Sequence, residues 1–300
     1  MTSSLSGRPT ASTIAGIALF LVAGLLFTSL DTIAKYLSRD YSIFQIAWAR
    51  YTFAMVAMAA LVPPSYRRRP LASAWPALQV LRGALLAGVT LMFFLAVSHL
   101  PLADVTAVSF ATPLIVTALG ALVLGEAVGP RGWTAVLVGF CGVLIIVRPT
   151  GTVHWAVFVT LVMAAGNAVF QILTRVVSRY DSPHTSASYT AIIGAIVFTM
   201  AAPFVWKAPD FTGWILHVLI GFAGGAGHYA LASAYNQAPA STLAPFTYLQ
   251  LVWITIAGLV VFGDFPDGWT ILGAGIVVAS GIYVFYRETG RRREAGGTAR

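Results

Sequence analysis

The sequence predicts an all-α membrane protein of ten transmembrane helices, arranged as two inverted five-helix repeats. The first observation is composition: of 300 residues, 58% are hydrophobic and only 9% are charged, whereas soluble domains carry about 25% charged residues. The second is that apolar runs recur along almost the whole chain, each near the roughly 20 residues that cross a bilayer as a helix. The third is that the second half of the chain repeats the order of features found in the first.

The repeat is clearest between residues 83–126 and 221–264, which align at a shift of 138. The matching positions are Gly83 and Gly221, Pro101 and Pro239, Gly125 and Gly263, and the acidic pair Glu126 and Asp264. Ten spans in two copies give five spans a copy. Because five is odd, the second copy enters the bilayer upside down, which is the plan of many secondary transporters.

The apolar runs predict ten spans and two repeats. The spans cover residues 13–35, 42–62, 75–99, 102–124, 133–147, 153–176, 185–204, 211–235, 241–262 and 269–286. We therefore predict a first repeat over 13–147, a second over 153–286, and polar tails over 1–12 and 287–300. The first span is too long for a signal-peptide core and has no small-residue cleavage site, so we expect it in the mature protein.

The basic residues predict that both chain ends are cytoplasmic. With that orientation, the inner loops and tails hold twelve arginines: Arg8, Arg67, Arg68, Arg69, Arg131, Arg175, Arg179, Arg287, Arg291, Arg292, Arg293 and Arg300. The outer side holds four basic residues: Lys35, Arg39, Arg148 and Lys207. This distribution follows the excess of positive charge on the cytoplasmic side of membrane proteins.

Ionisable side chains inside a span are costly, so they are the first candidates for function. Asp31 and Lys35 lie one turn apart near the outer end of the first span, where they can pair with each other. Arg50 lies within the second span, and Asp31 or Asp104 can balance its charge; structural pairing and a substrate or gating role both fit it. Arg82, near the inner end of the third span, is expected to reach the headgroups.

His228 lies within the eighth span among small residues, in GGAGHYALASAY. It fits a satisfied polar contact, a solute ligand or a proton carrier. Aromatic and amide side chains of the third, sixth and ninth spans can line a pocket for an amphiphilic solute, or face lipid and other helices instead. The predicted substrate-binding residues are Asp31, Phe94, Asn167, Gln171, His228, Tyr229, Tyr248, Gln250 and Trp253.

Four prolines mark predicted hinges or gates. Pro101 and Pro239 precede the fourth and ninth spans, and Pro113 and Pro245 interrupt those spans. A proline removes a hydrogen bond from a helix, and in a membrane the freed backbone must face protein or a water-filled cavity. Both a cavity-lining or hinging role and ordinary helix packing are consistent with this pattern.

Several classes of function find no support in the sequence. It contains no Gly-rich phosphate loop, no HExxH and no GxSxG, so we expect no enzyme activity and no cofactor. The single cysteine, Cys141, provides neither a disulfide framework nor a metal cluster. The net charge of +8 comes from loops and tails beside spans, which is a topology signal rather than a nucleic-acid site.

Over about residues 13–286 the chain resembles the drug/metabolite transporter superfamily, specifically its EamA type. The residues that carry the resemblance are the Pro101 and Pro239 hinges, LVLGE at 122–126 against VVFGD at 260–264, and the Gly-Trp pairs with Gly-rich helices at 132–142 and 268–281. Asp264 stands where this family usually has Glu. The resemblance implies a bacterial inner-membrane carrier whose cavity is enclosed mainly by helices one, three, four, six, eight and nine, with helices five and ten supporting dimers.

The function predicted from the residues and the resemblance is secondary transport of a small metabolite by alternating access. The aromatic and neutral amino-acid exporters are the preferred comparison, because the candidate residues are aromatic and amide-rich. Efflux of lipophilic cations or drugs, with Asp31 as the buried acid, is an alternative, as are riboflavin, S-adenosylmethionine and nucleotide-sugar transport. From a different class, an intramembrane enzyme would need clustered nucleophile and base side chains, and a scaffold would have a packed core with no cavity. The expected partners are the solute, the lipid bilayer and a second copy of the chain.

Overall fold

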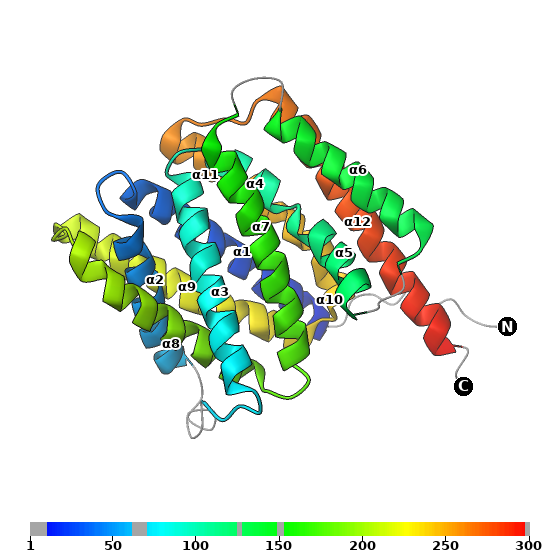
Figure 1. Ribbon diagram of the computed structural model, residues 1–300, viewed down its shortest axis with the longest axis horizontal. Helices are drawn as coiled ribbons and strands as arrows, with labels where there is room; N and C mark the ends of the chain where they lie inside the picture. The colour runs from blue at the N-terminus through cyan, green and yellow to red at the C-terminus, as the bar shows by residue number, and fades with distance from the viewer. Residues whose placement is uncertain (1–10, 62–70, 125–127, 149–152, 298–300) are drawn as a thin grey trace.

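The computed structural model describes residues 11–61, 71–124, 128–148 and 153–297 as a bundle of helices, with no strand in these ranges. The helices are α1 (Ala11–Leu37), α2 (Ile43–Leu61), α3 (Pro76–Val97), α4 (Leu102–Ser109), α5 (Thr112–Leu124), α6 (Pro130–Val147), α7 (Trp155–Val177), α8 (Pro183–Ala201), η2 (Ala202–Val205), α9 (Phe211–Gln237), α10 (Ala240–Leu243), η3 (Ala244–Tyr248), α11 (Leu249–Ala257), η4 (Gly258–Phe262) and α12 (Gly268–Gly297). Figure 1 shows how they are arranged.

Within the described residues these helices group into ten helical segments, in the predicted order. Seven are at least 18 residues long and apolar enough to span a membrane, one of them the joined pair α4 and α5. Two shorter apolar segments cover Phe246–Phe262 and Gly268–Tyr283, and α2 adds a further apolar helix of 19 residues. The predicted all-α, multi-span membrane architecture is therefore confirmed.

The fourth and ninth segments are interrupted beside their prolines. α4 ends at Ser109 and α5 begins at Thr112, directly before Pro113. In the ninth segment a 3-10 turn, Ala244–Tyr248, contains Pro245. Proline has no N–H to donate and its ring crowds the preceding turn, so each interruption follows from the local sequence. Both copies of the repeat thus carry a broken helix in the corresponding segment, although Pro113 and Pro245 are not matched positions.

The two other prolines start the broken segments in the same way. The carbonyl of Pro101 accepts a hydrogen bond from the Val105 N–H, and the carbonyl of Pro239 accepts one from the Leu243 N–H. These two bonds are related by the same shift of 138 that aligns the repeats. Each proline closes a short link and sets the first turn of the helix behind it.

The two repeats pack against each other reciprocally. α1 runs along α9, and α7 runs along α3; α2 and α8 pack in turn against α9 and α3. Small residues allow these close contacts. A Cβ on Gly83 would lie 3.0 Å from Ile193 Cβ of α8, and a Cβ on the matching Gly221 would overlap Phe53 Cβ of α2. Ile193 and Phe53 lie 140 residues apart on the corresponding helices α8 and α2, close to the shift of 138 between the two glycines, so the two repeats make similar packing contacts here.

α6 and α12, the last helix of each repeat, lie side by side along one flank of the molecule (Figure 1). Their backbones touch at Gly142 and Gly273. A Cβ on Gly142 would lie 2.8 Å from the Gly273 carbonyl oxygen, and a Cβ on Gly273 would lie 2.6 Å from the Gly142 carbonyl oxygen. This contact tolerates no side chain at either position without separating the helices.

Arg82 is a structural residue of the bundle interior. It is only 3% exposed, and its guanidinium donates hydrogen bonds to Gln79, Thr174, Thr190 and the Ser186 carbonyl. These partners come from α3, α7 and α8, so one cation ties three helices together. The expectation that Arg82 extends to the headgroups is wrong, because hydroxyl and carbonyl acceptors surround it inside the protein.

Asp181 holds the link between α7 and α8 against the start of α3. Its carboxylate accepts hydrogen bonds from the Ser73 hydroxyl, the Ala74 N–H and the Gln79 amide. Burial raises the pKa of Asp181, but these three hydrogen bonds outweigh burial and leave the pKa below its ordinary value. We call this side of the bundle the Asp181 end.

Replacing Asp181→Asn should lower the free energy of unfolding by about 1–3 kcal/mol at neutral pH, because one amide oxygen cannot serve three donors. The depressed pKa gives a contribution that is complete above the unfolded pKa and lost as the pH falls through the folded-state pKa. Melting temperatures of the purified wild type should therefore fall between about pH 5 and pH 3 more steeply than those of the variant. Asp40→Asn, at an exposed carboxylate, serves as the control; parallel pH curves for wild type and Asp181→Asn would contradict this role.

Candidate functional site

Three ionisable side chains from three helices converge inside the bundle. Arg50 of α2 is the charged neighbour of both Asp31 of α1 and His228 of α9. A Cβ on Gly224, one turn before His228, would lie 3.9 Å from Arg50 Cγ, an ordinary contact distance, so Arg50 lies beside this stretch of α9. The imidazole of His228 also packs edge-on against Phe27 of α1, with ring centroids 5.0 Å apart. We call Asp31, Arg50 and His228 the central cluster.

α3 holds the Arg50 side chain in place. The guanidinium donates a hydrogen bond of 2.6 Å to the Thr90 hydroxyl, which also pairs with the Tyr51 hydroxyl at 2.9 Å. The cation lies 5.8 Å from the Phe94 ring centroid and 5.3 Å from that of Tyr51. Among the described residues Arg50 forms no ion pair within 4.0 Å. It therefore keeps donors free for a ligand.

The central cluster borders solvent-accessible space. His228 is exposed, Asp31 and Arg50 are partly exposed, and Phe94 beneath Arg50 is buried. His228 shares its side of α9 with Gly221 and Gly224, which contact α2 and α1, so its exposure is not toward lipid. Tyr235, two turns further along α9 and on the same side, is also exposed. The exposed residues on this side of α9 thus include both His228 and Tyr235.

The structure separates Tyr229 from His228. Successive helix residues point about 100° apart, and Tyr229 lies on the same side of α9 as Phe222, two turns earlier. Both are exposed, and this side lies about 100° around α9 from His228. The structure places Tyr229 on the outer surface, away from the central cluster.

The remaining predicted residues lie in other places. Tyr248 packs against Phe110 at 5.4 Å and points its hydroxyl toward Gly281 of α12. Gln171 is exposed and lines a surface hollow beside Val116. Asn167 of α7, and Gln250 and Trp253 of α11, are partly exposed. The structure therefore brings together Asp31, Phe94 and His228 of the predicted set and adds Arg50.

Lys35 closes the bundle at the end opposite the Asp181 end. Its ammonium donates to Asp264 at 2.8 Å and to the Leu100 carbonyl at 3.1 Å, and it lies 4.9 Å from the Phe262 ring centroid. The predicted pairing of Lys35 with Asp31 is wrong. Gly263 explains the difference: its left-handed conformation, φ 73°, ends η4 and turns Asp264 back toward α1.

This interaction ties three parts of the chain together. α1 supplies the cation, the α3–α4 link supplies a carbonyl, and the link before α12 supplies the carboxylate. We call it the Lys35 clamp, and the side of the bundle that carries it the Lys35 end. The Lys35 clamp thus closes this end of the bundle in the described conformation.

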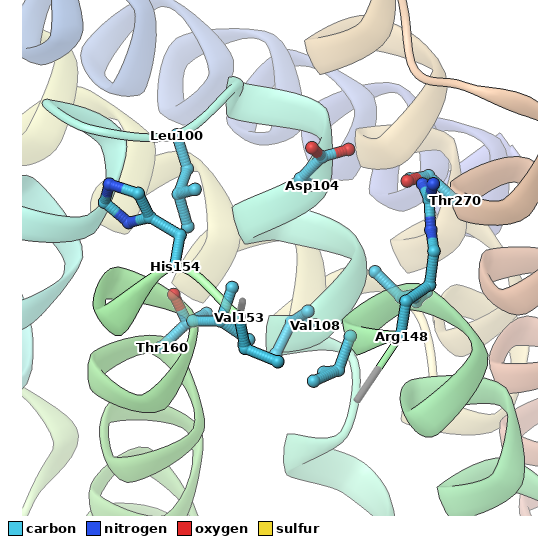
Figure 2. Close-up of a pocket in the computed structure, with 11 residues that line it drawn as sticks. Leu100, Asp104, Val108, Arg148, Val153, His154, Thr160 and Thr270 are labelled. Atoms are coloured by element: carbon cyan, nitrogen blue, oxygen red, sulfur yellow. The ribbon is translucent and has the colours of Figure 1, made fainter. Parts of the chain in front are cut away.

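A separate hollow of about 230 Å³ lies at the Lys35 end between α4, α6, α7 and α12. Figure 2 shows Asp104 between His154 on one side and Arg148 on the other. The Arg148 guanidinium pairs with Asp267. The Thr270 N–H and the Arg148 side chain hold the pKa of Asp267 below its ordinary value, so this pair stays ionised at neutral pH.

Comparison with known proteins gives one family and a set of transporters. The EamA-like transporter family matches residues 14–148 and again 154–286. The S-adenosylmethionine uptake transporter of Rickettsia bellii is 28% identical over 91% of this chain and 94% of its own length. The riboflavin transporter of Vibrio cholerae is 29% identical over 91% and 93%.

A third relative and a solved structure extend this likeness. The pseudopaline exporter CntI of Pseudomonas aeruginosa is 24% identical over 88% of this chain and 94% of its own length. One crystal structure superposes with a TM-score of 0.63 over 96% of this chain and 100% of that chain, at 17% identity. At that identity the structure shows a shared fold. None of the relatives named here is an amino-acid exporter by name.

Proposed function

Because the chain belongs to the EamA-like transporter family, we propose that it carries small metabolites with an amino-acid group, by alternating access, and that the central cluster is the solute site. The observation that carries the proposal is the convergence of Asp31, Arg50 and His228 on accessible space inside the bundle. Unpaired charges at this depth are costly unless a ligand or water satisfies them.

The charges of the central cluster suit a zwitterion. A guanidinium binds a carboxylate through two parallel hydrogen bonds, and Arg50 is oriented by Thr90 from behind. Asp31 supplies the opposite charge for an ammonium group. His228 and Phe27 offer ring faces and edges to the rest of the solute. A solute with both an ammonium and a carboxylate group would satisfy both charges at once.

The relatives support a broad range of solutes. One name contains S-adenosylmethionine, whose methionine part is an amino acid, and another contains riboflavin, which has no such group. The names include both uptake and export. The aromatic and amide-rich candidate residues favour export of an amino acid, and we propose this substrate and direction for this chain.

Alternating access would use the features that the two repeats share. In the described conformation the Lys35 clamp closes one end. The broken segments α4–α5 and α10–η4, with Pro101, Pro113, Pro239 and Pro245, are proposed to bend as the two repeats rock against each other. We further propose cytoplasmic chain ends, from the arginine distribution, and a homodimer in the bacterial inner membrane.

Flux into proteoliposomes tests this proposal. Purified protein is reconstituted without other proteins, and uptake and efflux of mixed amino acids are followed by mass spectrometry. Methionine, its methyl ester and its N-acetyl form provide a matched series, beside S-adenosylmethionine and riboflavin. We expect saturable flux of the zwitterions and at least about tenfold weaker flux of the two blocked forms, since each loses a charge-assisted hydrogen bond.

Two results would overturn this proposal in different ways. Saturable flux of riboflavin alone would remove the zwitterion and leave a transporter of another solute. Absence of saturable flux for every compound, in protein that melts cooperatively, would remove the transport function. Empty liposomes and liposomes with heat-unfolded protein provide the baseline.

A further inference from the structure

The hollow at the Lys35 end contains a carboxylate with one oxygen that lacks a partner. Asp104 Oδ1 is buried and forms no hydrogen bond within the described part of the chain. The Thr270 side chain is the hydrogen-bonding neighbour of this carboxyl group. The nearest cations are Arg148 and Lys35, but each has a carboxylate of its own, Asp267 and Asp264. When ionised, Asp104 therefore carries a negative charge that neither of these two cations balances.

A buried carboxylate without a compensating charge is costly, and such a group takes up a proton or a cation instead. A metal ion is disfavoured here, because the described residues contain no group of three His, Cys, Asp or Glu side chains able to hold one. A proton needs only the one free oxygen. It makes the group neutral and gives it an O–H to donate.

Water can bring the proton. A hollow of about 230 Å³ holds several water molecules at about 30 Å³ each, and polar walls keep them in place. Arg148 and Asp267 at its rim are 42% and 49% exposed, so the hollow reaches the surface at the Lys35 end. Figure 2 shows Asp104 directed toward the Thr270 side of this hollow.

The hollow and the clamp share a wall. The Leu100 side chain lines the hollow, and the Leu100 carbonyl accepts a hydrogen bond from Lys35. We propose that Asp104 is a proton-binding site filled from the Lys35 end, and that its charge state sets the strength of the Lys35 clamp. When Asp104 is protonated and neutral, the Lys35 ammonium interacts with Asp264 alone and the Lys35 clamp is strong. When Asp104 is ionised, its carboxylate also attracts the Lys35 ammonium, and the clamp with Asp264 is weaker.

Every charged or titratable neighbour enters this balance. Lys35 faces Asp104 from α1, Arg148 from the end of α6, and Asp267 from the start of α12. His154 lines the hollow at the start of α7, with His99 beyond it at 6.1 Å between ring centroids. Asp264 acts through Lys35. Arg148 and Asp267 cancel as a pair, which leaves Asp104 with Lys35 and His154 as its facing groups.

Labelling with a hydrophobic carbodiimide tests proton binding without any transported solute. The reagent modifies protonated carboxyl groups, and peptide mapping of purified wild-type protein compares Asp104 with the ion-paired Asp264 and Asp267 in one sample. From about pH 5 to about pH 9 we expect Asp104 to react at least tenfold more than the other two at the acid end, and to lose this reactivity as the pH rises. Equal labelling of the three residues across the range would overturn the proposal.

A reporter cysteine tests the link to the clamp. Cys141→Ala removes the single native cysteine, and His228→Cys then introduces the reporter. Labelling of this reporter is measured with an impermeant thiol reagent added from the Lys35 side. Because the reagent attacks the thiolate, whose fraction rises with pH in every sample, labelling at each pH is divided by that of the unfolded protein at the same pH. This normalised labelling should rise about fivefold toward alkaline pH in the otherwise unaltered chain, the effect of about 1 kcal/mol on the closed state. With Asp104→Asn added, the normalised labelling should stay low at every pH.

His154→Asn is the matched control, because asparagine preserves the cap that His154 gives to Ala156 N–H. It should keep the pH dependence. The labelling of His154→Asn could instead lose its pH dependence while the labelling of Asp104→Asn keeps it. That result would place the proton on His154 and overturn the proposal. The carbodiimide measurement decides the assignment even where Asp104→Asn does not fold.

Discussion

Arg50→Gln should raise the KM for zwitterionic solutes about 10- to 150-fold, which corresponds to the 1.5–3 kcal/mol of a hydrogen bond to a charged group. Glutamine can still bond to Thr90 but offers no positive charge to a carboxylate. The kcat should change much less, because the lost interaction holds the solute rather than a particular transition state. The measurement is concentration-dependent flux in proteoliposomes with matched protein amounts.

The same experiment contains its controls. Arg50→Lys keeps the charge and should recover part of the affinity. Arg179→Gln makes the same chemical change at an exposed position of the α7–α8 link and should leave the KM unaltered. Flux of the methionine methyl ester, which has no carboxylate, should respond little to Arg50→Gln. An unchanged KM for methionine itself in Arg50→Gln would remove Arg50 from the solute site.

Lys35→Met should open the Lys35 end. The clamp joins a 15% exposed ammonium to a 36% exposed carboxylate, so solvent screening limits the ion pair, and with the Leu100 bond we expect about 1–2 kcal/mol in total. That free energy shifts the closed-to-open ratio about 5- to 30-fold. The measurement is labelling of His228→Cys by an impermeant thiol reagent added from the Lys35 side.

Two further variants separate the clamp from general loosening. Lys207→Met removes an exposed lysine that lies 3.9 Å from Asp40 at the same end, and should leave the labelling unchanged. The exchange Lys35→Asp with Asp264→Lys restores the pair in reverse and should return the labelling toward the wild-type level. Equal labelling of wild type and Lys35→Met would show that another contact closes this end.

The helices were predictable because each is a local pattern. The predicted spans 75–99 and 211–235 correspond to α3, Pro76–Val97, and α9, Phe211–Gln237, since apolar length and helix-ending residues lie within each segment. The interruptions at Pro113 and Pro245 were predictable for the same reason. The partner of Lys35 was not, because Asp264 is 229 residues away and only the packed bundle brings the two together.

The candidate site was predictable in part. Asp31, Phe94 and His228 stand out as polar or aromatic groups within spans. For Arg50, structural pairing and a substrate or gating role both fitted the sequence. Its position is set by contacts across four helices, and no single span reveals them. Tyr229 could have been separated from His228 by helical geometry. Gly221 and Gly224 pack against α2 and α1 on the side of α9 that carries position 228, and position 229 points about 100° away from 228.

The reciprocal contact of Gly83 with Ile193 and Gly221 with Phe53 has a consequence for how the chain enters the membrane. A structure that nearly matches itself after being turned over gains the same packing whichever copy inserts first. This contact therefore gives no preference for either topology. The predicted excess of arginine in the inner loops and tails supplies one instead, so replacing a few of these arginines should produce a population inserted both ways.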